Sequence, residues 1–459
     1  MTSALFSPIK LADLELANRI VVSPMCQYSA DDGVASDWHI THLGMLANSG
    51  AALVVVEATG IERRGRITHG CLGLYSDDCE AALARVVAHC RRYGTAKFGI
   101  QLAHAGRKAS ARRPWEGGQP LAPAEDAWQT IAPSALAFGP DWPVPREMTA
   151  ADMEHVRDGF VDAAKRAIRA GIDTIELHAA HGYLLHSFLS PISNTRSDGY
   201  GGSLAARMRY PLEVARAVRA IMPHGMPLGA RITGNDWVEG GLTPDDAASF
   251  AKALKAAGLD FVCISSGGVS ADARPTLVAN TNVQFAEKVK REAGIATRTV
   301  GLIAAPKQAE AIVAEGKADM VALARAMLDD PHWGWRAAHA LGADVAPPQT
   351  VPARRAEGVG GGGVPRLIAR RPEITIAGRA AARRSPPVHQ RCAGIRSCRP
   401  ISRSRSRSSG RSTSHSVAGS CHVNPSSLRR RRVSPITPGE LQRMSENSAG
   451  AGARMPISA

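Results

Sequence analysis

The sequence contains no apolar run close to the roughly 20 residues that a membrane-spanning helix requires, so we expect no membrane span. Its first residues, Met1 to Arg19, mix charged and apolar side chains and lack the hydrophobic segment of a secretory signal. Eight cysteines scattered over 459 residues do not make a disulfide framework. These absences argue against a membrane protein or a disulfide scaffold and predict a cytoplasmic protein.

Lysine is absent after residue 350, where 21 arginines stand against four acidic residues. Residues 1–350 hold 35 basic and 37 acidic residues, so the net charge of +15 comes from the C-terminal tail alone. A domain that binds nucleic acid carries a strongly basic face, and the near-neutral first part of the chain does not predict one.

We place a domain boundary at residue 346, between an enzyme-sized domain (1–346) and a low-complexity basic tail (347–459). The tail contains Gly360–Gly363 and Arg429–Arg432 without a sustained apolar period, so we expect it to be disordered. Three interpretations stay open: a solvated tail, an arm that binds nucleic acid, and a shifted reading frame. Arginine without lysine, among Ser, Pro, Gly and Ala, is typical of a GC-rich gene translated in the wrong frame.

Strand-like apolar runs alternate eight times with amphipathic, helix-like segments in the first part of the chain. This alternation predicts a (β/α)₈ barrel, with residues 106–149 as an irregular insertion after the third strand. A doubly wound sheet is the alternative, but no GxGxxG motif follows the first strand. The predicted strands are Ile20–Met25, Ala51–Ala58, Lys97–Ala103, Asp173–Ala180, Pro227–Thr233, Asp260–Ser266, Thr297–Ile303 and Met320–Ala326. The predicted helices include Asp78–Gly94, Ala151–Gly171, Pro244–Gly258 and Pro306–Gly316.

Chemically active side chains gather where these strands end, which is the functional end of such a barrel. Strand one leads into Cys26 and Tyr28, and strand four delivers His178, His181 and Tyr183. A His-x-x-His pair can bind a metal, but a third ligand is then needed. The nearby candidates, His186 and Glu176, have no recognised metal-site spacing, so we expect no metal.

The order of these motifs resembles the Old Yellow Enzyme family of flavin-dependent ene-reductases, in particular its bacterial class of xenobiotic reductases and NADPH dehydrogenases. The resemblance covers roughly residues 5–342, and its most specific stretches are Ile175–Pro191, Tyr200–Ser203 and Arg231–Gly241. It implies a TIM barrel that holds FMN without a covalent bond and passes hydride from NADPH to an activated C=C bond. The protein then supplies position and charge, while the cofactor carries the redox chemistry.

The resemblance also implies how the cofactor is held. The backbone at Ser23, Pro24, Met25 and Cys26, together with Ala58, lies along the flavin ring, and Gln101 bonds its pyrimidine edge. Arg231 places a positive charge beside N1 and O2. Cys26 tunes the flavin potential rather than acting as a nucleophile. The residues expected at the phosphate are Gly267, Gly301, Ala324 and Arg325. Family members usually have glycine where this chain has Ala324, which would cost about 1 kcal/mol if a positive φ were required there.

The expected substrate is an enone or a related activated alkene. His178 and His181 would donate hydrogen bonds to its carbonyl oxygen, which stabilises the enolate that hydride addition creates. Tyr183 would protonate the α-carbon, since a neutral phenol is still protonated at pH 7. Tyr28 would line the pocket on the opposite side.

The family also implies a homo-oligomer, in which a C-terminal aromatic-and-arginine segment completes a neighbouring active site. This chain continues after Gln349 without the expected aromatic residue. Larger flavin dehydrogenases with an iron–sulfur cluster need four closely spaced cysteines after strand eight, and only Cys392, Cys398 and Cys421 follow. A barrel-derived nucleic-acid binder, driven by the basic tail, is the remaining alternative.

Overall fold

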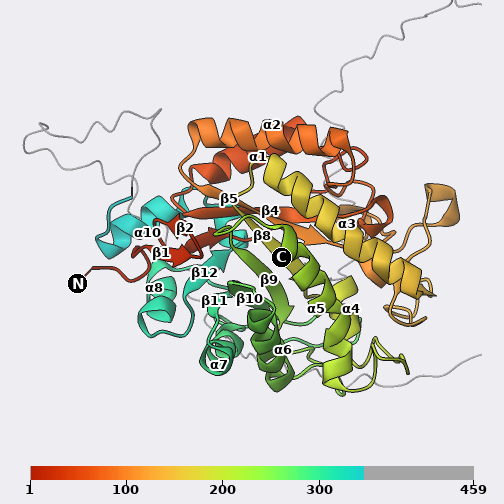
Figure 1. Cartoon of the computed structure of the whole chain (residues 1–459). Coiled ribbons are helices and arrows are strands. Elements are labelled where there is room, and N and C mark those ends of the chain that lie inside the picture. The colour runs from red at the N-terminus through yellow and green to blue at the C-terminus, as the bar shows by residue number, and fades with distance from the viewer. Residues whose placement is uncertain (1, 346–459) are drawn as a thin grey trace, which may run out of the picture. The chain divides into compact units, whose positions relative to one another are not determined.

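A closed barrel of eight parallel strands forms the centre of the computed structural model, which describes residues 2–345 (Figure 1). The strands follow one another around the barrel in sequence order, and β12 closes it by pairing with β3. They are β3 (Ile20–Val22), β4 (Leu53–Gly60), β5 (Lys97–Ala103), β8 (Thr174–Ala179), β9 (Leu228–Thr233), β10 (Phe261–Ser265), β11 (Ala296–Thr299) and β12 (Met320–Leu323). The predicted (β/α)₈ barrel is confirmed, and closure excludes the open doubly wound sheet.

The predicted basic tail at 347–459 lies outside the described residues, so its disorder and the domain boundary stay predictions. Three predicted strands end at least three residues early. The run predicted as Ile20–Met25 stops at Val22, so Ser23, Pro24 and Met25 lie on the loop that follows it. The run predicted as Thr297–Ile303 stops at Thr299, ahead of Gly301, which has a φ of +115°. The run predicted as Met320–Ala326 stops at Leu323, because a helix begins at Arg325.

Helices surround the barrel and follow its strands in turn (Figure 1). They are α1 (Asp37–Ala47), α2 (Asp77–Tyr93), α3 (Ala150–Arg169), α4 (Leu184–Leu189), α5 (Leu204–Ile221), α6 (Pro244–Ala256), α7 (Val283–Ala293), α8 (Pro306–Ala314), α9 (Arg325–Asp329) and α10 (Trp333–Leu341). The four helices that we predicted by range are α2, α3, α6 and α8. Within residues 2–345, no helix combines the length and the apolar character that crossing a membrane requires.

Helix α6 shows why these boundaries are readable from sequence. The Thr243 side chain accepts a hydrogen bond from the Asp246 N–H, and the Asp246 carboxylate accepts one from the Thr243 N–H. This reciprocal cap satisfies two N–H groups that a helix start leaves without partners, and a cap is worth about 1 kcal/mol. Pro244 occupies the first turn, where its missing N–H costs nothing.

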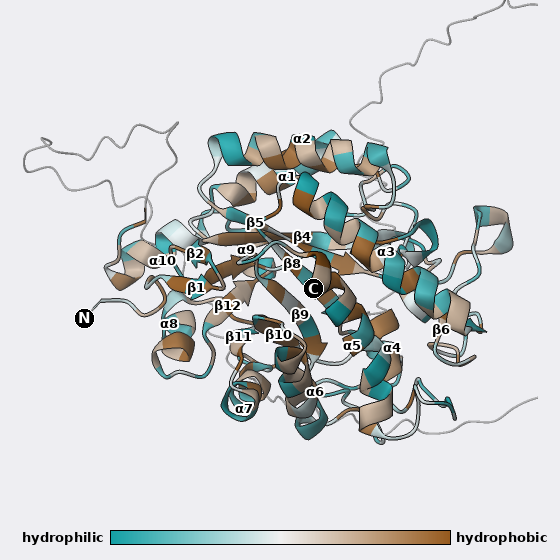
Figure 2. Ribbon diagram, in the orientation of Figure 1, coloured by the Kyte–Doolittle hydropathy of each residue, from teal (hydrophilic) through white to brown (hydrophobic). Residues whose placement is uncertain are grey.

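Strand β4 is buried on both faces, which explains its continuous apolar sequence. Val54 and Val56 pack into the core between barrel and helices, whereas Leu53 and Val55 point into the barrel interior. Figure 2 shows that the barrel strands are largely apolar, whereas the helices around them carry both apolar and polar residues. Burying each such side chain contributes about 1.5–3 kcal/mol.

A hairpin that the sequence analysis did not predict seals the N-terminal end of the barrel. It consists of β1 (Ile9–Leu11) and β2 (Leu14–Leu16). Leu11 and Leu16 share one buried cluster with Leu53 and Phe261, the first residues of β4 and β10. The strand ends that carry the chemistry therefore face the other way.

The insertion after β5 lies beside these C-terminal strand ends. It contains three short 3₁₀ turns and a two-stranded sheet: η2 (Gly106–Lys108), η3 (Pro114–Glu116), η4 (Pro123–Glu125), β6 (Ile131–Ala132) and β7 (Arg146–Glu147). Arg107 fixes it in place, because its guanidinium donates to the carbonyl oxygens of Val269 at 2.6 Å and Leu136 at 3.1 Å.

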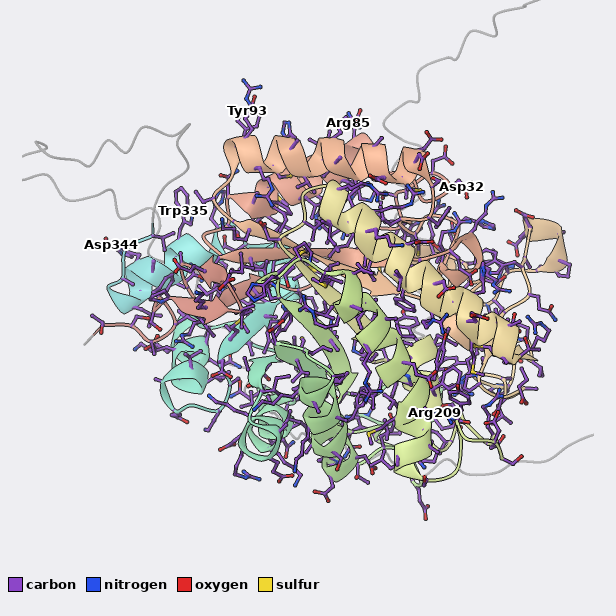
Figure 3. The ribbon with its side chains drawn as sticks, in the orientation of Figure 1. Asp32, Arg85, Tyr93, Arg209, Trp335 and Asp344 are labelled. Carbon is purple, nitrogen blue, oxygen red and sulfur yellow. The ribbon has the colours of Figure 1, made fainter. Side chains whose placement is uncertain are left out.

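The outer surface of the helices carries paired charges. Arg85 on α2 and Arg209 on α5 project away from the barrel (Figure 3). Each guanidinium meets a carboxylate, with Arg85 at 2.9 Å from Asp37 and Arg209 at 3.0 Å from Glu213. Exposed pairs of this kind contribute at most about 1 kcal/mol each.

Candidate active site

Parallel pairing brings the predicted catalytic side chains together. In the sheet register, His178 of β8 lies opposite Arg231 of β9, and Gln101 of β5 lies opposite Glu176 of β8. His178, Arg231 and Gln101 are each at most 3% exposed. A buried, polar cluster at the end of an otherwise apolar barrel costs desolvation energy, which is typical of a functional site.

His178 is a neutral hydrogen-bond donor in this structure. Its Nδ1 accepts a hydrogen bond from the Ala180 N–H at 3.3 Å, so the ring proton sits on Nε2. Burial holds the pKa of His178 well below its ordinary value, and the positive charge of Arg231 lowers it further. Its ring packs edge-on against His181 at 5.1 Å and Tyr183 at 4.8 Å between centroids.

His181 lies in a strained turn directly after β8. Its φ is +60°, and the turn is held by two bonds: its N–H donates to Thr233 Oγ1 at 3.2 Å, and its carbonyl oxygen accepts from Lys108 Nζ at 2.8 Å. Its Nε2 lies 2.7 Å from Ser265 Oγ, a partner that the sequence analysis missed. Burial and Arg231 lower the pKa of this imidazole as well, so both histidines are neutral at pH 7.

Gly182 explains why the turn has this sequence. A Cβ at that position would lie 2.3 Å from the carbonyl oxygen of Gly268, and the glycine has a φ of +75°. Glycine alone therefore allows the loops after β8 and β10 to approach this closely. The next residue, Tyr183, precedes helix α4 and is 8% exposed.

Two small cavities border residues that we expect beside the flavin ring. One is lined by Ala58 of β4 together with Tyr183 and Cys71. The other is lined by Ser23 and Met25, on the segment that follows β3, and by Leu43 and Leu46 of α1, so it lies between the barrel and that helix. Only the cavity at Ala58 and Tyr183 lies on the side of the predicted substrate residues.

The loop after β3 carries the remaining predicted ring contacts. Pro24 is buried there, and the backbone N–H of Gln27 donates to Glu57 Oε2 at 3.0 Å. Burial raises the pKa of the Cys26 thiol well above its ordinary value, and the Glu57 carboxylate raises it further. A neutral thiol is a poor nucleophile, in keeping with the tuning role expected for Cys26.

Tyr28 lies in the same loop and contacts the insertion. Its ring meets the edge of the exposed Trp115 ring at 5.8 Å, and its carbonyl oxygen accepts from Arg113 Nε at 3.1 Å. Burial raises the pKa of the Tyr28 phenol, which stays protonated at neutral pH.

The expected phosphate residues follow three neighbouring strands, β10, β11 and β12. Gly267 and Gly301 have positive φ values of +73° and +115°. Ala324 has a φ of −113°, so the cost that we considered for a left-handed alanine does not arise. Arg325 is exposed at the start of α9.

Both residues considered as a third metal ligand have other partners. Glu176 forms an ion pair with Arg298 inside the barrel. His186 Nδ1 accepts a hydrogen bond from the Gly182 N–H at 2.7 Å, and its Nε2 lies 3.1 Å from Asp236 Oδ1. Within residues 2–345, no group of three or more His, Cys, Asp or Glu side chains could hold a metal ion. Arg298 and Asp236 are distant in sequence from Glu176 and His186, so no local pattern could have revealed these two contacts.

Comparisons with known proteins give a consistent result. The model of the NADH:flavin oxidoreductase / NADH oxidase family matches residues 4–344. The NADPH dehydrogenase of Geobacillus thermodenitrificans is 44% identical over 350 residues, which are 76% of this chain and 97% of that protein. The NADPH dehydrogenase of Listeria innocua is 41% identical over 349 residues, 76% of this chain and 98% of that protein.

Solved structures show the same barrel. Morphinone reductase aligns with a TM-score of 0.63 and 27% identity, covering 77% of this chain and 92% of its own. A 2-naphthoyl-CoA reductase aligns with a TM-score of 0.65 and 25% identity, covering 75% of this chain but only 53% of its own. The alignment therefore covers about half of that longer chain.

The fold and its strand-end side chains define a barrel oxidoreductase that works with a flavin. The chain belongs to the NADH:flavin oxidoreductase / NADH oxidase family, and the predicted resemblance to the Old Yellow Enzymes is confirmed. FMN is the cofactor of this family, and the residues present fit it. The Gln101 amide and the Arg231 guanidinium are both buried, in β5 and β9, and suit the polar edge of a flavin ring. At Gly301, a Cβ would come within 3.0 Å of the Asn282 backbone nitrogen, so only glycine leaves room there.

Proposed function

We propose that this enzyme is an ene-reductase that uses NADPH to reduce the C=C bond of α,β-unsaturated carbonyl or nitro compounds. Bound FMN would supply the hydride chemistry. The observation that carries the proposal is the neutral His178 imidazole, with its proton on Nε2, packed against the Tyr183 ring at 4.8 Å. A neutral donor and a phenol side by side can polarise a carbonyl and protonate the neighbouring carbon.

Each site residue has a role in this proposal. His178 and His181 bind the substrate oxygen, with His181 exchanging its Ser265 contact for the substrate, and Tyr183 donates the proton. Tyr28 lines the opposite wall. The cofactor lies along Ser23, Pro24, Met25, Cys26 and Ala58, between Gln101 and Arg231 at one end and Gly267, Gly301, Ala324 and Arg325 at the other.

The direct test uses holoenzyme under anaerobic conditions. NADPH should bleach the flavin absorbance, and cyclohexenone or a nitroalkene should restore it, whereas the saturated ketone cyclohexanone should not. NADH run in parallel measures the preference between the two donors. If NADPH bleaches the flavin and oxygen alone restores it, the enzyme is a flavin oxidoreductase but the ene-reductase proposal is wrong.

A basic tail could instead make the chain a nucleic-acid binder. The near-neutral charge of residues 1–350 and the paired surface arginines of the barrel favour the enzyme. Truncation after Thr350 separates the two: bleaching by NADPH should persist in the shortened protein. Salt-dependent nucleic-acid binding without flavin in the full chain would contradict the proposal. We also propose, from the family, that the enzyme is a cytoplasmic homo-oligomer, which light scattering can test for assembly.

A further inference from the structure

Arg298 is a cation enclosed within the barrel. It projects inward from β11, its side chain is 0% exposed, and it forms an ion pair with Glu176 of β8. The two strands are separated by β9 and β10, so the pair spans the barrel interior. The guanidinium carbon lies 5.4 Å from the centre of the Phe261 ring. Burial lowers the pKa of Arg298 to about 9, which leaves it charged at pH 7.

Glu176 also binds Gln101, through its second carboxylate oxygen. Its Oε2 faces Arg298, and its Oε1 accepts a hydrogen bond from Gln101 Nε2 at 2.7 Å. Arg298, Glu176 and Gln101 are each at most 2% exposed, so water does not compete for these bonds. Three strands, β11, β8 and β5, are thereby joined by one polar chain.

The order of donors and acceptors in this series, from Arg298 through Glu176 to Gln101, fixes the orientation of the Gln101 amide. Arginine can only donate hydrogen bonds, and an ionised carboxylate can only accept them. The guanidinium of Arg298 in contact with Glu176 favours the ionised form of this carboxyl group. The Gln101 NH₂ group must therefore face Glu176, and its carbonyl oxygen Oε1 is turned to the other side.

We propose that Arg298 and Glu176 are positioning residues, which hold Gln101 so that Oε1 is the acceptor presented to the pyrimidine edge of FMN. That edge carries a single N–H, at N3, between two carbonyl groups. An acceptor can pair with N3–H, whereas an NH₂ group in its place would meet it donor to donor. The inference rests on the proposed placement of Gln101 beside the flavin.

The substitution Glu176→Gln tests the orientation with little change in shape. Arg298 would take the oxygen of the new amide, whose NH₂ group would then face Gln101 and reverse it. FMN should bind roughly tenfold more weakly, as expected when one hydrogen bond is lost. Adding Arg298→Met frees the oxygen of the new amide to accept from Gln101 again. The double variant E176Q/R298M should therefore bind FMN within about threefold of the unmodified enzyme.

The measurements are independent of turnover. FMN dissociation constants come from the fluorescence of released flavin, and the N3 resonance of ¹⁵N-labelled FMN reports the hydrogen bond itself. E176Q should shift this resonance, and E176Q/R298M should restore it. Arg207→Met, which removes another buried arginine that bonds the Leu189 carbonyl at 2.7 Å, should lower thermal stability without moving the N3 resonance.

Gln101→Leu decides whether the effect passes through the amide. It should weaken FMN binding by itself, and adding Glu176→Gln should then cause no further loss. If E176Q weakens FMN equally with and without the amide, the effect is general destabilisation and the positioning role is wrong. If Gln101→Leu changes neither the affinity nor the resonance, Gln101 does not face the flavin and the inference falls. Should E176Q alone not fold, E176L/R298M takes its place, because it leaves the Gln101 NH₂ group without an acceptor. FMN affinity and the N3 resonance should then change, whereas those of E176Q/R298M should not, and unchanged values in E176L/R298M would overturn the inference. Reduction of enones is measured separately, so a failure of the proposed substrate class is distinct from either result.

Discussion

Asp236 joins the loop after β9, through His186, to the turn after β8 that carries His181. Its Oδ1 lies 3.1 Å from His186 Nε2, and both side chains are fully buried. The other oxygen, Oδ2, accepts hydrogen bonds from Ser190 Oγ and the Leu242 N–H, each at 2.7 Å. Since His186 Nδ1 in turn accepts from the Gly182 N–H, one carboxylate supports the backbone between His181 and Tyr183.

Asp236→Asn should destabilise the protein by about 3 kcal/mol, because an amide offers one acceptor and an NH₂ group where three donors converge. Burial alone would raise the pKa of Asp236, but His186 and the bonds from Ser190 and Leu242 outweigh it and hold the pKa below its usual value. Its stabilisation is therefore present above about pH 4 and is lost as the pH falls through the lower folded pKa. Urea unfolding from pH 3 to 7 measures this loss. An unchanged acid dependence in Asp236→Asn would contradict the assignment.

His178→Ala should lower kcat/KM for cyclic enones about a hundredfold while FMN stays bound, since it removes a donor to the developing enolate oxygen. The pKa of His178 lies well below its ordinary value, so the imidazole gains no proton near neutrality. His178 should thus contribute no step to the rate profile between pH 6 and 8. Stopped-flow reoxidation by cyclohexenone measures the effect, with His89→Ala on the exposed side of α2 as the control. If flavin reduction collapses while enone affinity holds, the role given to His178 is wrong.

Gly182→Ala should cost about 3 kcal/mol and impair substrate binding, because the new Cβ would lie 2.3 Å from the Gly268 carbonyl oxygen. Gly202 offers a matched control. Its φ of +77° is close to that of Gly182, but a Cβ there meets no atom within 4 Å. Gly202→Ala should therefore show only the backbone penalty, about 1 kcal/mol. Equal unfolding free energies for the two variants would show that the close approach of the two loops is not what requires Gly182.

Lys108 should make stability rise with pH above neutrality. Its ammonium group lies 4.6 Å from the Phe138 ring centre and 5.0 Å from that of Tyr183, and burial lowers its pKa to about 7. Between this value and the unfolded pKa of about 10.4, the unfolded chain holds one more proton, so the free energy of unfolding increases with pH. Lys108→Met should remove this increase, as measured by urea unfolding at pH 6, 8 and 9. Lys97→Met, at the exposed start of β5, should keep it.

The sequence predicts the barrel because buried strands and capped helices leave local signals. The runs of β8 and β9 and the caps of α2 and α6 lie within a residue or two of their predicted positions. The hairpin of β1 and β2 escaped because its strands have three residues each, too few to establish a period.

The candidate site divides in the same way. The places of His178 and Gln101 near the C-terminal ends of β8 and β5 could be predicted, because they lie in apolar strand runs and belong to a family motif. The residues that hold these side chains in place could not be predicted. Arg298 and Glu176 lie 122 residues apart in sequence, and each alone would pass for a surface charge. The bond of His181 to Ser265 likewise depends on two loops meeting in space, which no local pattern encodes.

The hairpin that carries Leu11 and Leu16 closes the end of the barrel opposite the proposed site. Ser3 and Ala4 are anchored to Glu310 of α8, and the chain then passes through the hairpin into the first barrel strand. A tether to a solid support, joined at the amino terminus, should leave the C-terminal strand ends, where we propose the active site, free for reactants. For an immobilised biocatalyst, this is the end of the chain to attach.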